Sequence, residues 1–218
     1  MLLGMPGALP LLLTSLAAGP NVPVDNEQVR VVIAANEPGQ KSRPHKHEVN
    51  RVMIHLDPGK MRLTYEDGKV NDVEFKAGDV RWDPADGIHT SENAGSTTYH
   101  IVEVELKKPG TGQPVAWPAL DPVKVDPGHH NVEIENDQVR VLRFRLPARD
   151  KTPIHEHMLG RVTVYLTDQF VRVTLANGRG STFHNPAGKV STGERAKHAE
   201  RNLTDRAGEV IFVELKTK

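Results

Sequence analysis

Histidine is the residue type whose number and spacing stand out in this chain. The 218 residues include 11 histidines; His45 and His47 are one residue apart, and His89 lies 42 positions beyond His47. Side chains two apart on a strand point to the same face, so His45 and His47 would present both imidazoles to one side. Three imidazoles converging from two elements predict a metal site with open coordination positions, which suits ligand binding or catalysis better than a structural role.

The absence of cysteine restricts what such a site can be. With no cysteine in the chain, disulfides, thiolate metal centres and a cysteine nucleophile are excluded. A metal would have to be held by nitrogen and oxygen ligands, which indicates a divalent transition ion. Fe, Mn, Zn, Ni and Cu all satisfy this condition, and the sequence does not distinguish among them.

The histidine pattern occurs twice. Segment Asp25–Val31 recurs as Glu135–Val141, shifted by 110 positions. The same shift takes His45 to His155, His47 to His157 and Arg51 to Arg161, and after the loss of one residue a shift of 109 takes His89 to His198. A register held over this length indicates a duplicated unit. We therefore predict one divalent metal per barrel, held by His45, His47 and His89 in the first copy and by His155, His157 and His198 in the second.

Composition divides the chain into four parts. The copies are expected at 22–107 and 130–218, and the segment between them, 108–129, is rich in proline and glycine and predicts an extended linker. We expect Trp117 to anchor this linker on the surface of one barrel. The segment 1–21 is rich in leucine, has no charged side chain before residue 21 and ends its apolar run in Ala17 and Ala18. It predicts a secretory signal peptide or a disordered leader, and hence an exported protein of the periplasm or the extracellular space.

Apolar residues in both copies alternate with a period of two. Such runs, broken by Asp-Gly, Pro-Gly and Asn-Gly, predict antiparallel strands and hairpins. The expected strands include 51–56, 98–106, 139–146, 161–166, 170–175 and 209–215. No segment has a convincing helical stripe. The predicted fold class is all-β, with a closed or double-sheet barrel in each copy.

Two segments of the first copy resemble a known family. Gly39–His47 is similar to the first motif of the cupin superfamily, and Gly78–Asn93 is similar to the second. The resemblance covers nearly all of the chain after residue 21 and implies a bicupin, two tandem antiparallel jelly-roll barrels. Because cupins include dioxygenases, isomerases, decarboxylases, storage proteins and ligand sensors, it implies the fold far more strongly than a reaction.

The sequence departs from the cupin pattern at the acidic ligand. Cupins usually add a glutamate three or four residues after the second histidine, where this chain has Arg51 and Val52, and Arg161 and Val162. We expect that an ion here would lack local neutralisation, and that three neutral imidazoles beside a guanidinium would favour an anionic ligand. Three-histidine cupins are found among thiol and diketone dioxygenases. In the second copy Arg149 stands in place of the motif glycine, so this site is expected to be the less well kept.

Strand alternation also predicts the residues that line each pocket. Counting from the second histidine of each copy, the substrate-binding candidates are Arg51, Met53 and His55 in the first copy and Arg161 and Tyr165 in the second, with Thr163 on the same face as pocket wall. The arginines allow two interpretations, an anion contact or an ion pair at the barrel rim. His100, His129, His130 and His184 match no motif and are interpreted as surface or loop residues. No residue is predicted to be catalytic.

Charge narrows the function further. Lys+Arg and Asp+Glu both number 28, so the chain has no net positive charge with which to bind nucleic acid or an anionic membrane. The leading hypothesis is a metal-binding bicupin that binds and acts on a small anionic molecule, with an Fe(II)-type dioxygenase as the enzyme version. The alternatives are a non-catalytic exported binding or scaffold protein with relic metal sites, and a metal-independent isomerase. A homo-oligomer is compatible with all three.

Overall fold

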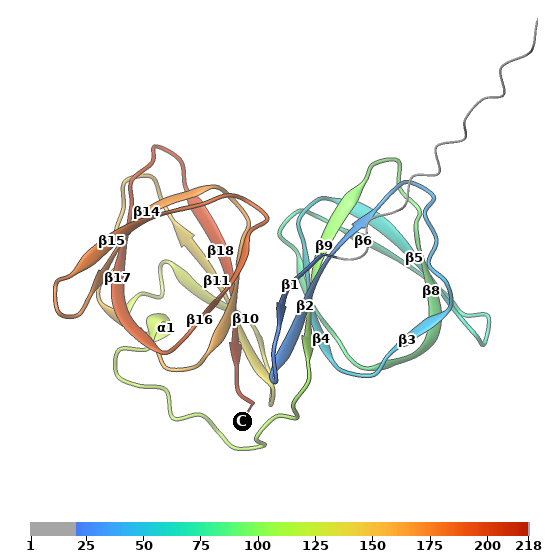
Figure 1. Cartoon of the computed structure of the whole chain (residues 1–218), viewed down its shortest axis with the longest axis horizontal. Coiled ribbons are helices and arrows are strands. Elements are labelled where there is room, and N and C mark those ends of the chain that lie inside the picture. Colours follow the sequence, from blue (N-terminus) through green and yellow to red (C-terminus); the bar gives the residue numbers. More distant parts are fainter. Residues whose placement is uncertain (1–20, 218) are drawn as a thin grey trace, which may run out of the picture.

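The structure of the protein is a computed structural model that describes residues 21–217. Its elements form two barrels that lie side by side, with the linker running along one edge of the pair (Figure 1). No helix in this range has the length and apolar character needed to cross a membrane. The predicted leader lies outside the described residues, apart from Asn21, which begins the first strand.

The first barrel contains nine strands in two antiparallel sheets. The strands are β1 (Asn21–Asp25), β2 (Val29–Asn36), β3 (His45–His47), β4 (Arg51–His55), β5 (Gly59–Tyr65), β6 (Val70–Phe75), β7 (Val80–Asp83), β8 (Asp86–Asn93) and β9 (Tyr99–Leu106). One sheet has the order β1-β2-β9-β4-β7 and the other β3-β8-β5-β6. The two motif histidines of β3 and the third histidine on β8 are therefore on neighbouring strands.

The second barrel repeats this arrangement. Its strands are β10 (His130–Glu135), β11 (Val139–Leu146), β12 (His155–His157), β13 (Arg161–Tyr165), β14 (Gln169–Leu175), β15 (Gly180–Asn185), β16 (Val190–Gly193), β17 (Ala196–Asn202) and β18 (Gly208–Leu215). The sheet orders are β10-β11-β18-β13-β16 and β12-β17-β14-β15. The all-β fold class and the tandem-barrel architecture predicted from the sequence are thus confirmed.

Alternation along the central strands gives each of them two buried faces. In β4, Val52 and Ile54 belong to a core between the barrels, whereas Arg51, Met53 and His55 line a cavity inside the first barrel. All five residues of β4 are buried. The strand has no solvent face because one side packs against the other barrel and the other side faces the cavity.

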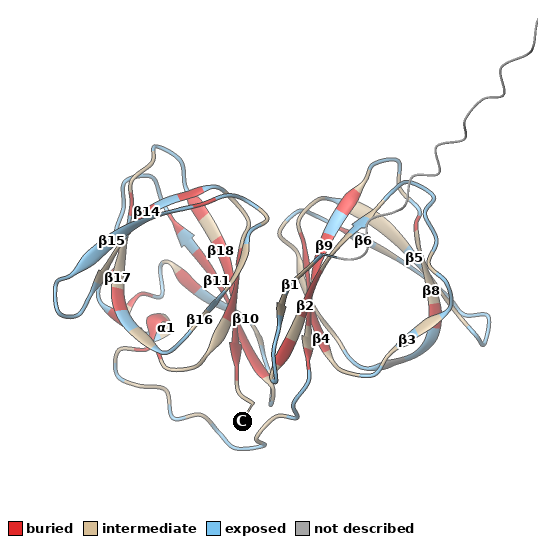
Figure 2. Cartoon of the chain, in the orientation of Figure 1, coloured by how far each residue is buried: buried red, intermediate tan, exposed pale blue. Residues whose placement is uncertain are grey.

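The core between the barrels is formed by both five-stranded sheets. Buried residues concentrate where these sheets face each other (Figure 2). The cluster draws on both copies and contains Val29, Val31, Val52, Ile54, Val102, Val104, Leu106, Val139, Val141, Val162, Val164, Ile211, Val213 and Leu215. Because apolar burial stabilises folding in proportion to the area removed from water, this shared core holds the two sheets against each other.

The linker packs on the second barrel. The guanidinium carbon of Arg140 lies 3.3 Å from the centroid of the Trp117 ring, so Trp117 does contact the barrel as expected. A single-turn helix, α1 (Pro122–Val125), follows; the Asp121 carboxylate caps it by accepting a hydrogen bond from the amide of Val123. The linker therefore reaches β10 through an ordered turn.

Candidate metal centres

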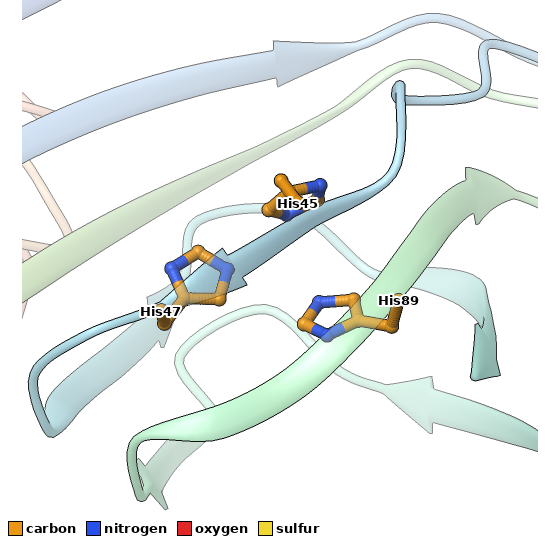
Figure 3. Close-up of side chains that lie close together, drawn as sticks. All are labelled: His45, His47 and His89. Carbon is orange, nitrogen blue, oxygen red and sulfur yellow. The ribbon is translucent and has the colours of Figure 1, made fainter. Parts of the chain in front are cut away.

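The three histidines predicted for the first copy lie together. His45 and His89 face each other directly across β3 and β8, and the His45, His47 and His89 rings point toward one another (Figure 3). Their ring centroids are 4.7 to 5.4 Å apart. One nitrogen from each ring lies within 4.8 Å of the others. Nitrogens bound to one ion at about 2.1 Å lie roughly 3 Å apart, so small side-chain adjustments would close the set around a metal.

Backbone carbonyl groups orient two of these rings. The Nδ1 of His45 donates to the Arg43 carbonyl at 2.9 Å, and the Nδ1 of His89 donates to the Gly87 carbonyl at 3.0 Å. A hydrogen bond of this kind selects the tautomer whose Nε2 lone pair is available, as is usual for metal-bound histidine. The donor set therefore fits a divalent transition ion.

Arg51 occupies the position of the usual acidic ligand and is held by carboxylates. It forms ion pairs with Asp83 and, at 2.8 Å, with Glu103, while its Nη1 lies 2.7 Å from both ring nitrogens of His47. Of the two interpretations of this residue, the structure shows the ion pair. Arg51 is only 4 % exposed in this pair, and an anion contact by Arg51 stays a prediction.

The same contacts correct the expectation about charge at the metal. The sequence predicted that a metal in the first copy would lack local neutralisation, yet Asp83 and Glu103 both line the cavity beside the histidines. Oxygens of Glu103 and Glu105 lie within 4.8 Å of a His47 nitrogen. Burial raises the pKa of Glu103, and Arg51 partly opposes this shift. Carboxylates are therefore present at the site, supplied by β7 and β9 instead of β4.

The remaining first-copy candidates form the cavity wall. Met53 and His55 line the same cavity, whose volume is about 70 Å³. His55 stacks on Phe75 at 3.8 Å, and burial, with a smaller contribution from Arg81, lowers its pKa to about 4. His55 is therefore neutral at pH 7 and packs as an aromatic wall.

In the second copy the predicted histidines also lie close together. His155 and His198 face each other across β12 and β17, with ring centroids 4.7 Å apart, and His157 lies 5.2 Å from His155 and 5.5 Å from His198. Desolvation by burial lowers the pKa of all three, and that of His198, lowered further by the other two histidines and Arg161, falls to about 2. They are neutral at pH 7, as metal ligands must be.

A fourth histidine joins this group, and the sequence did not predict it. His130, interpreted as a surface or loop residue, is only 1 % exposed, and its ring lies 5.0 Å from that of His155. Among the described residues of this barrel, the group with ligand nitrogens within 4.8 Å of one another is His130, His155 and His157. The Nε2 atoms of these three residues are buried without a hydrogen-bond partner. Each such atom costs about 1 to 3 kcal/mol if nothing binds it.

Arg161 differs from its counterpart Arg51 in what surrounds it. Across the sheet Arg51 is paired with Asp83, whereas Arg161 is paired with Gly193, and Phe212 stands where the first copy has Glu103. Within residues 21–217 no carboxylate lies within ion-pair distance of Arg161; its Nη1 donates to the Glu194 carbonyl at 2.8 Å, and its buried Nε has no partner.

A larger cavity adjoins Arg161. Its volume is about 420 Å³, and it is lined by Arg161, Thr163 and Tyr165, by His198 and Glu200, and by apolar residues of β14 and β15. Burial raises the pKa of Glu200 to about 7, an effect that Arg161 partly opposes. Leu175 and Phe183 also line it and remain 45 and 47 % exposed, so the cavity opens to solvent along an apolar wall.

The sequence did not reveal four of the residues at these sites. Glu103 and His130 come from strands outside the motifs, whereas Asp83 lies within the second motif and Glu200 shares β17 with His198. They reach the sites through strand pairing and barrel closure, which the sequence does not display. The sequence carried one signal for His130, which is a histidine at the start of the second predicted barrel, directly after the linker.

Solved structures provide a comparison for the fold. AerE from Microcystis aeruginosa is 11 % identical, covers 90 % of this chain and 96 % of its own, and has a TM-score of 0.60. Oxalate decarboxylase is 12 % identical, with coverage of 88 % and 70 % and a TM-score of 0.60. Vicilin from hazelnut, Corylus avellana, is 12 % identical, with coverage of 88 % and 76 % and a TM-score of 0.58.

Sequence comparisons add no relative to this set. No protein-family model matches the chain, and no curated protein matches it. At these identities the structural likeness speaks for the fold alone. Oxalate decarboxylase and vicilin are both bicupins, and the strand order and the duplicated histidine positions agree with the resemblance of the motifs. The chain therefore has a bicupin-like fold of two tandem antiparallel barrels.

Proposed function

We propose that this protein is a metal-dependent bicupin whose first barrel holds a divalent transition ion on His45, His47 and His89 and binds a small anionic molecule there. The observation that carries the proposal is the convergence of these three rings, two of them oriented by backbone carbonyls, at the wall of one cavity. Three protein ligands leave coordination positions for a ligand from solution.

Charge supports the anionic character of the ligand. The ionisable side chains of the cavity wall, apart from histidine, are two arginines and two acids, Arg51, Arg81, Asp83 and Glu103, so their charges cancel when both acids are ionised. A divalent ion held by neutral imidazoles would then give the cavity a net positive charge, which attracts anions. The cavity of about 70 Å³, far smaller than that of the second barrel, favours a compact molecule.

We further propose an oxidative reaction, with dioxygenase activity as the version to test first. The three-histidine motif without the motif glutamate resembles the thiol and diketone dioxygenases among cupins. A bound metal would supply Lewis acidity or redox chemistry, while Met53 and His55 exclude water from one side of the cavity. Manganese and oxalate belong among the first metals and substrates tested, because the structurally similar oxalate decarboxylase has Mn(II) centres.

The experiment compares metal content and oxygen uptake. Purified protein and a His45→Ala variant are loaded with Fe(II), Mn(II) or Zn(II), and the bound metal is measured. Oxygen uptake is then followed with small carboxylates, thiols and diketones. His100→Ala is the matched control, because His100 is exposed and pairs with Asp57 instead of the site. Loss of one bound ion and of turnover in His45→Ala alone is expected; equal metal content in both variants would refute the proposal.

A second candidate function has its own observation. Arg161 is a half-buried arginine with no carboxylate at ion-pair distance in the described chain; its buried Nε has no hydrogen-bond partner, and it borders an open cavity with apolar walls. Such a site suits an anion with an apolar portion, because the guanidinium pairs with a carboxylate while the walls bury the remainder. This is the non-catalytic ligand-binding alternative, located in the second barrel.

Calorimetric titration with short-chain carboxylates tests that alternative. Arg161→Gln should weaken binding at least tenfold, whereas Arg145→Gln, a change at an exposed arginine paired with Glu209, should not. Binding that is the same in all three proteins would rule out Arg161 as the anion contact. Export and assembly into a homo-oligomer stay predictions, to be tested by cell fractionation and light scattering.

A further inference from the structure

The second barrel contains a histidine that the duplication does not account for. His130 is the first residue of β10, directly after the linker, and the 110-residue register places Pro20 at the corresponding position of the first copy. The His130 ring stacks on Phe144 at 4.6 Å and lies 5.0 Å from His155. It is therefore a feature of the second barrel alone, added to the two histidines of the repeated motif.

The nitrogens of His130, His155 and His157 are arranged as a metal-binding set. Each Nδ1 donates to an oxygen: His130 to the Asp126 carbonyl at 3.3 Å, His155 to the Pro153 carbonyl at 3.1 Å, and His157 to Glu214 at 2.9 Å. The Nε2 atoms then have lone pairs, and none of them has a hydrogen-bond partner. Three buried acceptors close together, with no donor among them, require a cation to satisfy all three at once.

We propose that His130, His155 and His157 bind one borderline divalent ion, such as Zn²⁺, in a closed site, with His198 covering its remaining side. The three rings are 0 to 1 % exposed, and the residues that line the cavity of this barrel include His198 but none of these three. Structural metal sites have no coordination position open to solvent, and the burial of these three histidines meets that condition. The proposal is independent of metal binding in the first barrel.

Contacts behind the ligands connect this ion to the linker. Glu214, which accepts from His157, also accepts from Arg140 at 2.7 Å, and Arg140 donates to Asp121 at 2.7 Å. Asp121 caps the start of α1, and the Asp126 carbonyl that holds His130 lies at the end of that helix. Both ends of α1 are thus joined to metal ligands, so the ion would fix the linker to the second barrel.

Metal content of matched variants tests the ligand set. The protein is stripped with a chelator, reloaded with Zn²⁺, desalted and analysed for zinc. We expect His130→Gln to hold one ion fewer than the wild-type chain, whereas His184→Gln, a change at an exposed histidine of β15, holds the same number. Unchanged zinc in His130→Gln overturns the proposal. Loss of the ion in His198→Gln alone, with His130→Gln unaffected, also overturns it in favour of the set predicted from sequence.

A second measurement covers the case in which His130→Gln does not fold. In His45→Ala, which leaves this site intact, Zn²⁺ should bind at one ion per chain and raise the Tm by about 5 to 10 °C at a hundredfold excess over Kd. No binding by His45→Ala overturns the proposal. If instead the first barrel binds no metal, wild type and His45→Ala would each hold one ion. Failure of the proposed function can therefore be distinguished from failure of this proposal.

The link to the linker has a separate readout. Trypsin cleavage after Lys124, which lies within α1, should be at least tenfold faster after the metal is stripped, and Zn²⁺ should restore protection in His45→Ala but not in His130→Gln. Equal cleavage rates with and without bound zinc would overturn the structural role.

Discussion

Replacing Arg51 by glutamine should strengthen metal binding in the first barrel while weakening the metal-free fold. Arg51 is a buried cation between His47, Asp83 and Glu103. The substitution removes the positive charge and leaves both acids without their partner. The two consequences have opposite signs, and together they distinguish this arrangement from a simple packing role.

The effect on metal binding follows from distance. The Nη1 of Arg51 lies 2.7 Å from the His47 nitrogens, and a metal–nitrogen bond adds about 2.1 Å, so the two cations would be at most about 4.8 Å apart. Charges of +1 and +2 at that distance repel by about 7 kcal/mol at an effective dielectric constant of about 20. Proton uptake by Glu103, whose pKa burial already raises, offsets much of this. We expect at least a tenfold gain in affinity, or about 1.4 kcal/mol.

The effect on the metal-free protein follows from the broken ion pairs. Removing one partner of a buried pair typically costs about 3 to 5 kcal/mol. For a chain of this size the Tm should fall by roughly 6 to 20 °C. Arg51→Lys is the matched control, because it keeps the charge; it should lower the Tm less and should not raise metal affinity.

Competition with a chromophoric chelator measures the affinity, and calorimetric melting of stripped protein measures the stability. Both are best made in a His130→Gln background, so that only the first barrel is titrated. An affinity of Arg51→Gln at or below that of wild type would refute the reasoning, because it would mean that the guanidinium does not oppose the ion.

Further predictions concern pH, the cavity of the second barrel and the linker. Burial lowers the pKa of five histidines. It falls to about 4 for His55 and to about 2 for His130 and His198, and it is also lowered for His155 and His157. Since these histidines are protonated near pH 6.5 in the unfolded chain and not in the native state, stability present above pH 6.5 is lost below it. At one pH unit lower the loss is about 1.4 kcal/mol for each of His55, His130 and His198, or about 4 kcal/mol for the three, and His155 and His157 add to it in the same direction. Glu200, with its pKa raised to about 7, acts in the opposite direction and stabilises the native state by about 2 kcal/mol over the same interval. The free energy of unfolding of stripped protein is measured in urea, and a value that does not change with pH would contradict these assignments. Gly193→Asp restores the acid that pairs with this arginine position in the first copy and should abolish carboxylate binding at Arg161, whereas Gly193→Asn should weaken it less, as calorimetric titration would show. Trp117→Ala removes the ring stacked on Arg140 and should lower the free energy of unfolding in urea by about 2 kcal/mol. Faster trypsin cleavage with an unchanged free energy of unfolding would show that the ring does not stabilise the fold.

The strands were predictable because their pattern is local. The expected strand at 139–146 coincides with β11, and that at 51–56 exceeds β4 by one residue. Alternation fixes which residues share a face, and this placed Arg51, Met53 and His55 on the cavity side. The same logic brought His45 and His47 to one face, and the spacing of the second motif brought His89 opposite them.

What the sequence could not supply is the identity of cross-strand neighbours. Arg51 was assigned to the cavity, but its state depends on Asp83 in β7 and Glu103 in β9. Those residues are 32 and 52 positions away, and only the register of the closed barrel brings them together. From the sequence, an arginine near a metal predicted an anionic ligand. In the first copy, however, Asp83 and Glu103 already pair with this arginine.

The duplication itself concealed the differences that matter most. Matching positions drew attention to the residues the copies share, whereas the chemistry of the two barrels diverges where they differ. Asp83 and Glu103 correspond to Gly193 and Phe212, so the first copy neutralises its arginine and the second leaves it available. His130 has no histidine counterpart, and its ring lies 5.0 Å from that of His155 and 6.3 Å from that of His157. As a result of these three differences, the first barrel has His45, His47 and His89 on its cavity wall, whereas the second keeps His130, His155 and His157 off the wall of the cavity that Arg161 and His198 line.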